Sequence, residues 1–260
     1  MSNPIQHSAH ASGAASAALG NVRVVLCSTS HPGNIGACAR AMKTMGLEHL
    51  TLVNPKYFPH SEAEAMASRA TDILDRARVC SNLDEALNGT VFAAASTARN
   101  RDLSHEVLTP REVAARMIAE AHHGPVALVM GAEKFGLTVD EVNRCNVITT
   151  VPANPQYSSL NLASAVQLFA YELRSAALQR DRLPQQTFAP AEHGEIELFY
   201  SHLERTLLDI GFLNPKEPKR LMQRMRRLFA RARLEHEEVN ILRGILNAAQ
   251  ECARKAGKLD

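Results

Sequence analysis

Short apolar runs alternate with segments of helical periodicity along most of the chain, and this alternation restricts the possible fold more than any other feature. Each run has the length and the aliphatic composition of a buried strand. The runs occupy 22–27, 50–53, 91–95, 126–130 and 147–151. Apolar strands separated by helices are typical of a mostly parallel sheet covered by helices on both faces. The sequence therefore predicts an α/β domain over residues 21–180, with its ligand beyond the carboxyl ends of the strands.

The segments that flank this domain have different compositions. The first twenty residues contain no Lys or Arg and are rich in Ala, Ser and Gly, so we expect a disordered tail over 1–20 and no signal peptide. Two prolines and several polar residues indicate a linker over 181–195. The remaining residues, 196–260, have helical periodicity without strand signals and predict a small all-helical extension.

Composition excludes several classes of protein. With 45% hydrophobic and 22% charged residues in 260, the chain has the composition of a globular protein that can bury a full core. Its five cysteines form no C-x-x-C pair, which argues against a disulfide framework or a zinc site and favours a reducing, cytoplasmic compartment. No apolar run approaches the ~18–20 residues that span a bilayer.

Positive charge is concentrated near the C-terminus. The net charge of the chain is +2, but Lys216–Arg233 holds eight basic residues and one acidic residue, so the rest of the chain is net negative. Within this segment four arginines recur at helical spacing and form one basic stripe: Arg220, Arg224, Arg227 and Arg231. Such a stripe can be a solvated helix face, a partner for acidic residues or a binding surface for RNA phosphates. We favour phosphate contact because no acidic residue interrupts the stripe.

The loop after the first strand is the first candidate for chemistry. Gly33 and Gly36 can let backbone amides approach an anion at the start of the next helix, and Arg40 follows in the second turn of that helix. The loop is neither a Walker A sequence nor a dinucleotide-binding fingerprint. Taken alone, it is more typical of a Gly/Pro turn followed by a surface arginine.

Two further loops follow strands in the same way. Residues 130–137 contain two glycines and Glu133, whose carboxylate is expected at the carboxyl end of the sheet, although a solvated turn is an equal alternative. Residues 96–101 also follow a strand, where an exposed basic turn is the simpler interpretation.

The loop at 151–162 is rich in hydrogen-bonding side chains. Two prolines stiffen it before it enters a long helix, and Ser158, Ser159 and Asn161 are each suitable N-cap residues. Capping accounts for any one of the three but not for all of them together.

The combination of these loops is far more specific than each one alone. N-x-G-x-x-x-R at Asn34–Arg40, G-x-E-x-x-G-L at Gly131–Leu137 and S-S-L-N-L at Ser158–Leu162 occur in that order. This order resembles the three motifs of the SPOUT-class RNA methyltransferases, over about residues 21–178. With S-T-A-R at Ser96–Arg99 and the helical extension, the chain is similar to the bacterial tRNA (cytidine/uridine-32) 2'-O-methyltransferases.

The resemblance implies a C-terminal trefoil knot in the α/β domain, a rare exception among protein folds. It implies S-adenosylmethionine as methyl donor and no metal. By the resemblance, the cofactor is bound by Ser96, Thr97, Ala98, Met130, Gly131, Ala132, Val151, Ser159, Leu160 and Asn161.

The resemblance also implies the catalytic residues and the partners. Arg40 is the residue to which the family assigns the proton of the attacking hydroxyl, with Asn34, Glu133 and Ser159 positioning it and the ribose. A guanidinium is a poor base, so Arg40 can instead hold the target phosphate. The implied partners are tRNA and a second copy of the chain, whose cofactor Arg40 can serve; the charge pattern separately predicts that the arginine stripe contacts the tRNA.

Two other functions are compatible with the sequence. A SPOUT enzyme of this kind can act on another tRNA or rRNA nucleotide, because the fold and the cofactor site do not fix the substrate. A non-catalytic RNA-binding protein could use the basic helix alone, although Asn34, Arg40 and Ser159 together argue against it.

Overall fold

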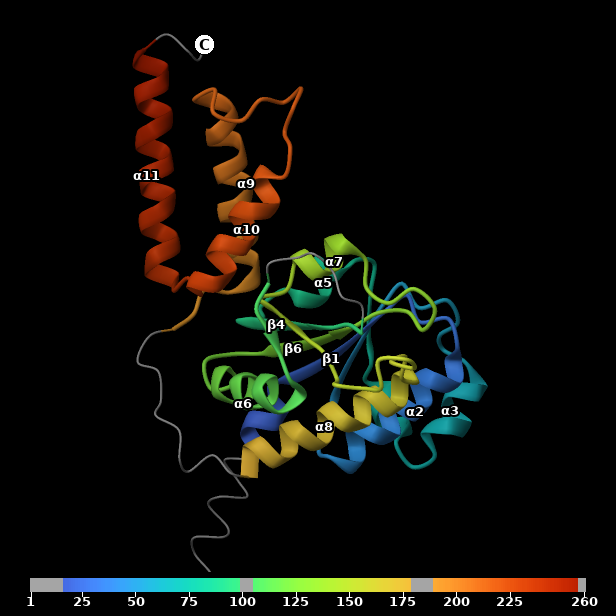
Figure 1. Ribbon diagram of the computed structural model, residues 1–260. Helices are drawn as coiled ribbons and strands as arrows, with labels where there is room; N and C mark the ends of the chain where they lie inside the picture. Colours follow the sequence, from blue (N-terminus) through green and yellow to red (C-terminus); the bar gives the residue numbers. More distant parts are fainter. Residues whose placement is uncertain (1–15, 99–104, 179–188, 257–260) are drawn as a thin grey trace, which may run out of the picture. The chain divides into compact units, whose positions relative to one another are not determined.

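The computed structural model describes residues 16–98, 105–178 and 189–256 (Figure 1). The chain divides into two compact units, residues 1–185 and 186–260, and each is described by itself.

The first unit is built on a seven-stranded sheet in the order β3-β2-β1-β6-β4-β7-β5, with all pairs parallel. Its strands are β1 Val22–Cys27, β2 His49–Val53, β3 Arg78–Cys80, β4 Phe92–Ser96, β5 Val107–Leu108, β6 Val126–Met130 and β7 Val147–Thr149. Every residue of β6 is buried, as expected for a central parallel strand. The predicted α/β class and parallel sheet are confirmed.

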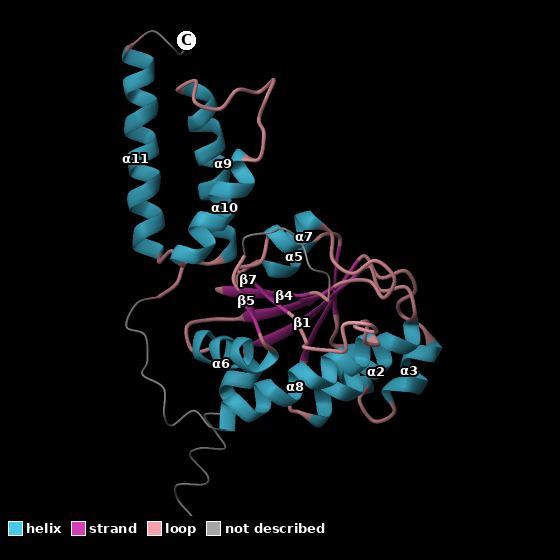
Figure 2. Ribbon diagram, in the orientation of Figure 1, coloured by secondary structure: helices cyan, strands magenta, loops and turns pink. Residues whose placement is uncertain are grey.

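Helices cover both faces of this sheet, with α2, α3, α6 and α8 on one side and α5 and α7 on the other (Figure 2). Their bounds are α2 Pro32–Thr44, α3 Ser61–Ala67, α4 Thr71–Asp75, α5 Leu83–Leu87, α6 Pro110–Glu120, α7 Val139–Asn143 and α8 Leu162–Leu178. Successive side chains of β1 point to opposite faces of the sheet, so the core has two parts. Val24 and Leu26 pack in one apolar cluster, and Val25 and Cys27 pack in the other.

The N-terminal tail is shorter than the sequence predicts. Residues 16–20 form a helical turn, and its apolar side chains Ala18 and Leu19 are buried in the core of the first unit. Burial of these two side chains orders the segment that we expected to be disordered up to residue 20. Residues 1–15 of the expected tail lie outside the described residues.

The second unit consists of α9 His193–Asp209, α10 Leu221–Ala232 and α11 His236–Lys255, which confirms the predicted helical extension. Phe199 and Tyr200 of α9 are central to its core, and the Phe229 ring of α10 meets Phe199 edge-on with centroids 4.8 Å apart. The unit begins inside the expected linker, because the Ala191 amide donates to the Leu234 carbonyl at 2.9 Å. The linker residues 181–188 lie outside the described residues.

Two further properties concern the described residues. None of the helices there is long and apolar enough to cross a membrane. All five cysteines are free, and four of them are buried in the first unit.

Candidate functional site

The loops predicted to carry chemistry meet at one edge of the sheet. β1, β6, β4 and β7 are consecutive neighbours and run parallel, so the loops that follow them emerge side by side at the carboxyl edge. Segments far apart in the sequence are thereby brought together, as the loop motifs predict.

Glu133, in the loop after β6, connects the first and second loops. One carboxylate oxygen accepts hydrogen bonds from the Ser30 amide and the Ser30 hydroxyl, both at 3.0 Å. The other oxygen accepts from the Asn34 side-chain amide at 2.9 Å and from the His31 backbone amide at 3.3 Å. Four donors, three from the loop before α2 and one from its first turn, therefore converge on a single carboxylate.

The charge of Glu133 is maintained by these donors. Burial acts to raise the pKa of its carboxyl, but the hydrogen bonds from Asn34 and Ser30 outweigh burial and hold the pKa below its ordinary value. The residue is therefore an ionised acceptor at neutral pH and is suited to holding a loop in place.

Asn161 ties the third loop to the same network. Its side-chain oxygen accepts from the amides of Ala163 at 2.9 Å and Ser164 at 3.3 Å, so Asn161 caps α8. Its side-chain nitrogen donates to the Asn34 side-chain oxygen at 3.1 Å. Of the three possible caps that the sequence offers, Asn161 is the one whose side chain binds the first amides of α8, which leaves the hydroxyls of Ser158 and Ser159 for another use.

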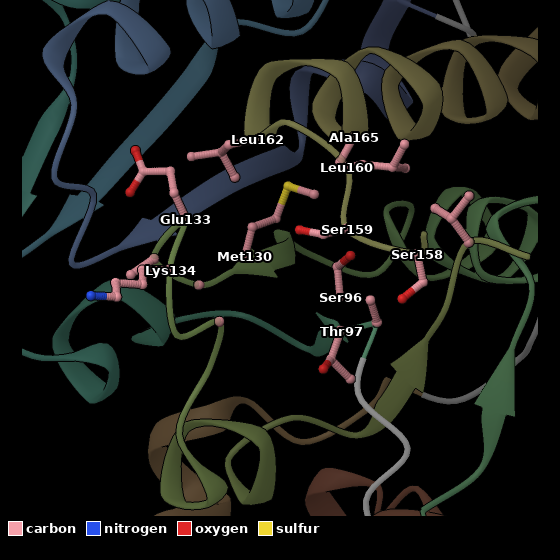
Figure 3. Close-up of a pocket in the computed structure, with 15 residues that line it drawn as sticks. Ser96, Thr97, Met130, Glu133, Lys134, Ser158, Ser159, Leu160, Leu162 and Ala165 are labelled. Atoms are coloured by element: carbon pink, nitrogen blue, oxygen red, sulfur yellow. The ribbon is translucent and has the colours of Figure 1, made fainter. Parts of the chain in front are cut away.

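A cavity of about 400 Å³ lies next to this network, between the loops after β4, β6 and β7 (Figure 3). Nine of the ten residues expected to bind the cofactor line it, all except Asn161: Ser96, Thr97, Ala98, Met130, Gly131, Ala132, Val151, Ser159 and Leu160. Ser96, Met130 and Ser159, from three different segments, lie together in the middle of the view, while the Glu133 carboxylate points away from them (Figure 3). The predicted cofactor residues are thus gathered around one space.

Two glycines shape the loop that forms one wall of the cavity. A Cβ on Gly131 would lie 2.1 Å from the carbonyl carbon of Gly136, so the two strands of this turn can approach only without a side chain there. Gly136 has φ of +64°, in the left-handed region that favours glycine. Both glycines of the second motif are therefore required by the turn itself.

Arg40 lies apart from the cavity lining. Its side chain is exposed and borders a second, more open hollow between α2 and α8, together with small side chains such as Ala37, Ala41 and Ala163. In the described part of the chain Arg40 forms no ion pair. The structure therefore brings Asn34, Glu133 and Ser159 to the cavity region but does not place Arg40 in the cavity.

Sequence reasoning missed several residues at this site. Ser30 is a main partner of Glu133, and Lys134, Gly136, Ser158, Leu162 and Ala165 complete the cavity lining. Lys134, Gly136, Ser158 and Leu162 are part of the quoted motifs but were not named among the expected cofactor residues, and Ala165 follows the third motif by one helical turn. The motifs themselves were therefore the available signal. No group of three or more potential metal ligands occurs among the residues that the structure describes.

The basic stripe has a distinct environment in the second unit. Arg224 and Arg231 are exposed and Arg227 is partly buried, and none of the stripe arginines forms an ion pair with a described residue. Arg226, on another side of α10, is instead bound by both carboxylate oxygens of Glu197 at 2.6 and 2.7 Å. Among the described residues, the stripe arginines therefore do not form the ion pairs that were one alternative for them, whereas Arg226, outside the stripe, is paired with Glu197.

Comparison with known proteins gives matches along most of the chain. The family described as "SpoU rRNA Methylase family" matches residues 21–171, and "tRNA methyltransferase TrmJ, C-terminal domain" matches residues 194–258. The tRNA (cytidine/uridine-2'-O-)-methyltransferase TrmJ of Pectobacterium atrosepticum is 49% identical over 236 residues, which cover 90% of this chain and 98% of that protein.

Two other relatives extend the comparison. The tRNA (cytidine/uridine/adenosine-2'-O-)-methyltransferase TrmJ of Pseudomonas aeruginosa is 48% identical, over 91% of this chain and 96% of its own. The crystal structure of TrmJ from Z. mobilis superposes with a TM-score of 0.76 at 34% identity, covering 87% of this chain and 97% of that one.

Proposed function

Because the chain belongs to the SpoU methylase family, we propose that it transfers a methyl group from S-adenosylmethionine to a ribose 2'-hydroxyl of tRNA. The acceptor is cytidine or uridine at position 32 of the anticodon loop, and the reaction takes place in the cytoplasm. The observation that carries this proposal is that nine of the ten residues expected to bind the cofactor line one and the same cavity.

The cavity fits S-adenosylmethionine in size and chemistry. Its volume of about 400 Å³ is within the ~300–1,000 Å³ of small-molecule sites. Small side chains and loop backbone from three segments leave room for the adenine ring and offer it hydrogen-bonding groups. When bound, the cofactor supplies a methyl group on a sulfonium, which is already activated for transfer, and no metal is required.

A trefoil knot is part of the same proposal. It is supported by the neighbouring positions of β4 and β7 and by the loops that follow both strands, which line one cavity.

The residues of the chain then have chiefly to align the ribose, since orientation supplies much of the rate enhancement for such a transfer. Glu133, Asn34 and Asn161 hold the three loops in register and thereby position Ser159 at the cavity. Because the Glu133 carboxylate accepts hydrogen bonds from Ser30, His31 and Asn34, Glu133 and Asn34 act as positioning residues.

Arg40 requires a second copy of the chain in this proposal. The hollow beside Arg40 is bordered by small side chains of α2 and α8, which permit close approach of another helix. In a homodimer formed there, Arg40 reaches the substrate in the partner's cavity and holds the target phosphate through its planar fork. The hydroxyl proton passes to the phosphate or to water, because the guanidinium stays protonated.

Methylation mapping tests the proposed function. The purified protein, S-adenosylmethionine and tRNA are expected to yield 2'-O-methylcytidine or 2'-O-methyluridine at position 32 by mass spectrometry, and tRNA from a deletion strain should lack it. Modification of another nucleotide, including adenosine, would reassign the substrate. Absence of heat on calorimetric titration with S-adenosylmethionine would favour the non-catalytic RNA-binding protein.

Replacing Ser159 by alanine is expected to weaken S-adenosylmethionine binding about fivefold, the loss of one neutral hydrogen bond. Stability should change by less than about 0.5 kcal/mol, because Asn161 caps α8 and Ser159 is exposed. Calorimetry with the cofactor and thermal melting measure the two effects. Ser201→Ala, at an exposed serine of the second unit, serves as the control, and a loss of stability matching the loss of binding would make Ser159 a structural residue.

The arginine stripe is proposed to contact tRNA phosphates outside the cavity. Each neutralised phosphate contributes about 0.7–0.9 to the slope of log affinity against log salt. Glutamine at all four positions should therefore reduce that slope by about 3 and raise KM for tRNA more than it lowers kcat. Filter binding at several salt concentrations measures the slope.

A charge-matched variant separates the stripe from net charge. It carries glutamine at four exposed basic residues of the same unit: Arg205, Arg243, Arg254 and Lys255. If both variants reduce the slope equally, the effect comes from overall charge, and the stripe has no special role.

A further inference from the structure

Exposed aromatic rings are concentrated at the carboxyl edge of the sheet. In the described part of the first unit four aromatic side chains are largely exposed, and three of them are on loops that follow strands: Tyr57, Phe135 and Tyr157, at 49%, 63% and 81% exposure. The fourth, Tyr171, is on α8. Large apolar rings left in water at one edge indicate a surface that binds something flat and apolar.

Two of the three rings, Phe135 and Tyr157, are carried by hydrogen-bonded turns. The Gly136 amide donates to the Ala132 carbonyl at 2.7 Å and closes the turn that presents Phe135. The Tyr157 amide donates to the Asn154 carbonyl at 2.9 Å, in a turn that contains Pro155. These turns fix the backbone that carries the two rings, so binding of a ligand costs little conformational entropy of the loops.

Tyr57 is attached to the same site by the backbone. The amide of Lys56 donates to the Thr29 carbonyl at 3.0 Å, and Thr29 directly precedes Ser30, a partner of Glu133. The loop after β2 is therefore held against the first motif loop.

Two of the rings have a lysine beside them. The Lys56 ammonium lies 5.2 Å from the centre of the Tyr57 ring, and the Lys134 ammonium lies 5.3 Å from that of Phe135. A cation next to a stacking ring matches the chemistry of a nucleotide, in which a phosphate accompanies each base. The same pairing occurs on two different loops.

Two of the rings are carried by residues next to the cavity lining, on different sides of the cavity. Lys134 and Ser158 lie on opposite sides of it (Figure 3), and they precede Phe135 and follow Tyr157 directly in the sequence. The strands that precede these loops, β2, β6 and β7, are each separated by one intervening strand, so the strand ends are about 10 Å apart per step. The three loops that carry the rings thus follow strands in a row along the edge that holds the cavity.

From this arrangement we infer that Tyr57, Phe135 and Tyr157 receive unpaired bases on either side of the target nucleotide, while Lys56 and Lys134 contact the intervening phosphates. The inference rests on the proposed function and extends it to the conformation of the RNA. Single-stranded loops are recognised by splaying their bases onto aromatic side chains, whereas the bases of a duplex are stacked on one another. The rings therefore select an open loop, in which the target ribose can turn into the site.

Binding of an anticodon stem-loop oligonucleotide to the full-length protein tests the inference. Tyr157→Ala and Phe135→Ala should each raise Kd at least fivefold, the factor that corresponds to about 1 kcal/mol per stacked base. Tyr157→Phe should restore binding, because the ring is retained, and Tyr157→Leu should not. Met66→Ala, an exposed apolar residue of α3, is the control and should leave Kd unchanged.

An RNA with abasic positions flanking the target completes the test as a double-mutant cycle. The wild type should lose affinity for this RNA, and Tyr157→Ala should lose little more, because the stacking partner is already absent. If Tyr157→Ala and Phe135→Ala bind the intact stem-loop like the wild type, the inference is wrong and the rings serve another partner. Equal losses on intact and abasic RNA would equally overturn it.

Methyl transfer by the wild type distinguishes the two proposals. A wild type that methylates the stem-loop while the ring variants bind normally would refute only the stacking surface. A wild type that binds no S-adenosylmethionine and transfers no methyl group would refute the proposed function, and the inference with it.

Discussion

Alanine at position 40 is expected to reduce methyl transfer at least about 100-fold, a typical loss when one group that stabilises a transition state is removed. S-adenosylmethionine binding and the melting temperature should stay close to those of the wild type, because Arg40 is exposed and outside the cavity lining. Steady-state kinetics, calorimetry and thermal melting measure the three quantities. Arg40→Lys should also be inactive, since an ammonium cannot reproduce the planar bidentate contact. Near-normal turnover in either variant would contradict the assignment.

A mixing experiment shows which cavity Arg40 serves. Arg40→Ala is combined with Gly131→Ala, in which the added Cβ would lie 2.1 Å from the Gly136 carbonyl carbon and distort the cavity wall. If Arg40 acts across a two-fold dimer, a mixed dimer has one complete site, and an equal mixture should recover about a quarter of wild-type activity. If Arg40 acts within its own chain, no dimer in the mixture has a complete site, and activity should stay absent.

Glu133→Gln is expected to have the second largest effect. Four donors converge on the Glu133 carboxylate, and a glutamine amide would turn an additional donor towards them. The free energy of unfolding should fall by about 1–3 kcal/mol, the cost of leaving a partly buried donor unsatisfied. Methyl transfer should fall by more than the loss of folded protein accounts for, because the first and second loops lose their connection. Urea unfolding and kinetics on the folded protein measure the two effects.

Glu112→Gln is the matched control. Hydrogen bonds from the Thr109 amide and hydroxyl also hold the pKa of Glu112 below its ordinary value, but Glu112 is part of a helix capping box, in which glutamine is an accepted replacement. It should therefore be nearly neutral, and equal damage from both substitutions would argue against a special role for Glu133.

The pH dependence of stability provides a further check on Glu133. Its folded-state pKa is depressed, so its contribution is present above the unfolded pKa and is lost as the pH falls through the folded value. The advantage of the wild type over Glu133→Gln should thus shrink in acid.

The sequence was most informative where physical signals are local. Val126–Met130 is a continuous apolar run and Val22–Cys27 is interrupted only by Arg23, and both are central strands of the sheet. The strands β3 and β5 were not predicted from the sequence. They have only three and two residues and lie at the two edges of the sheet, where burial does not impose an apolar pattern. The burial of Ala18 and Leu19 was not predicted either, because two apolar residues in a segment of small residues show no periodicity.

For the candidate site, the lining residues were predictable from the sequence, but the contacts of their side chains were not. The resemblance identified the residues around the cavity, but the direction of each side chain depends on tertiary contacts. Asn161 was expected at the cofactor, yet its amide is divided between α8 and Asn34. Arg40 was expected near the same ligand as the glycines of its loop, but the helical rotation from Asn34 turns it to the side of α2 that faces α8.

The hydrogen bonds that assemble the site connect residues very distant along the chain. Asn34 is 99 residues from Glu133 and 127 residues from Asn161. Contacts of such sequence separation form only after the intervening chain has become compact, and parallel sheets rich in them fold slowly. During synthesis the nascent first unit therefore has no site until α8 has left the ribosome. If the proposed function holds, a chain truncated before α8 does not bind the methyl donor there, and cofactor binding then reports completed folding of the first unit.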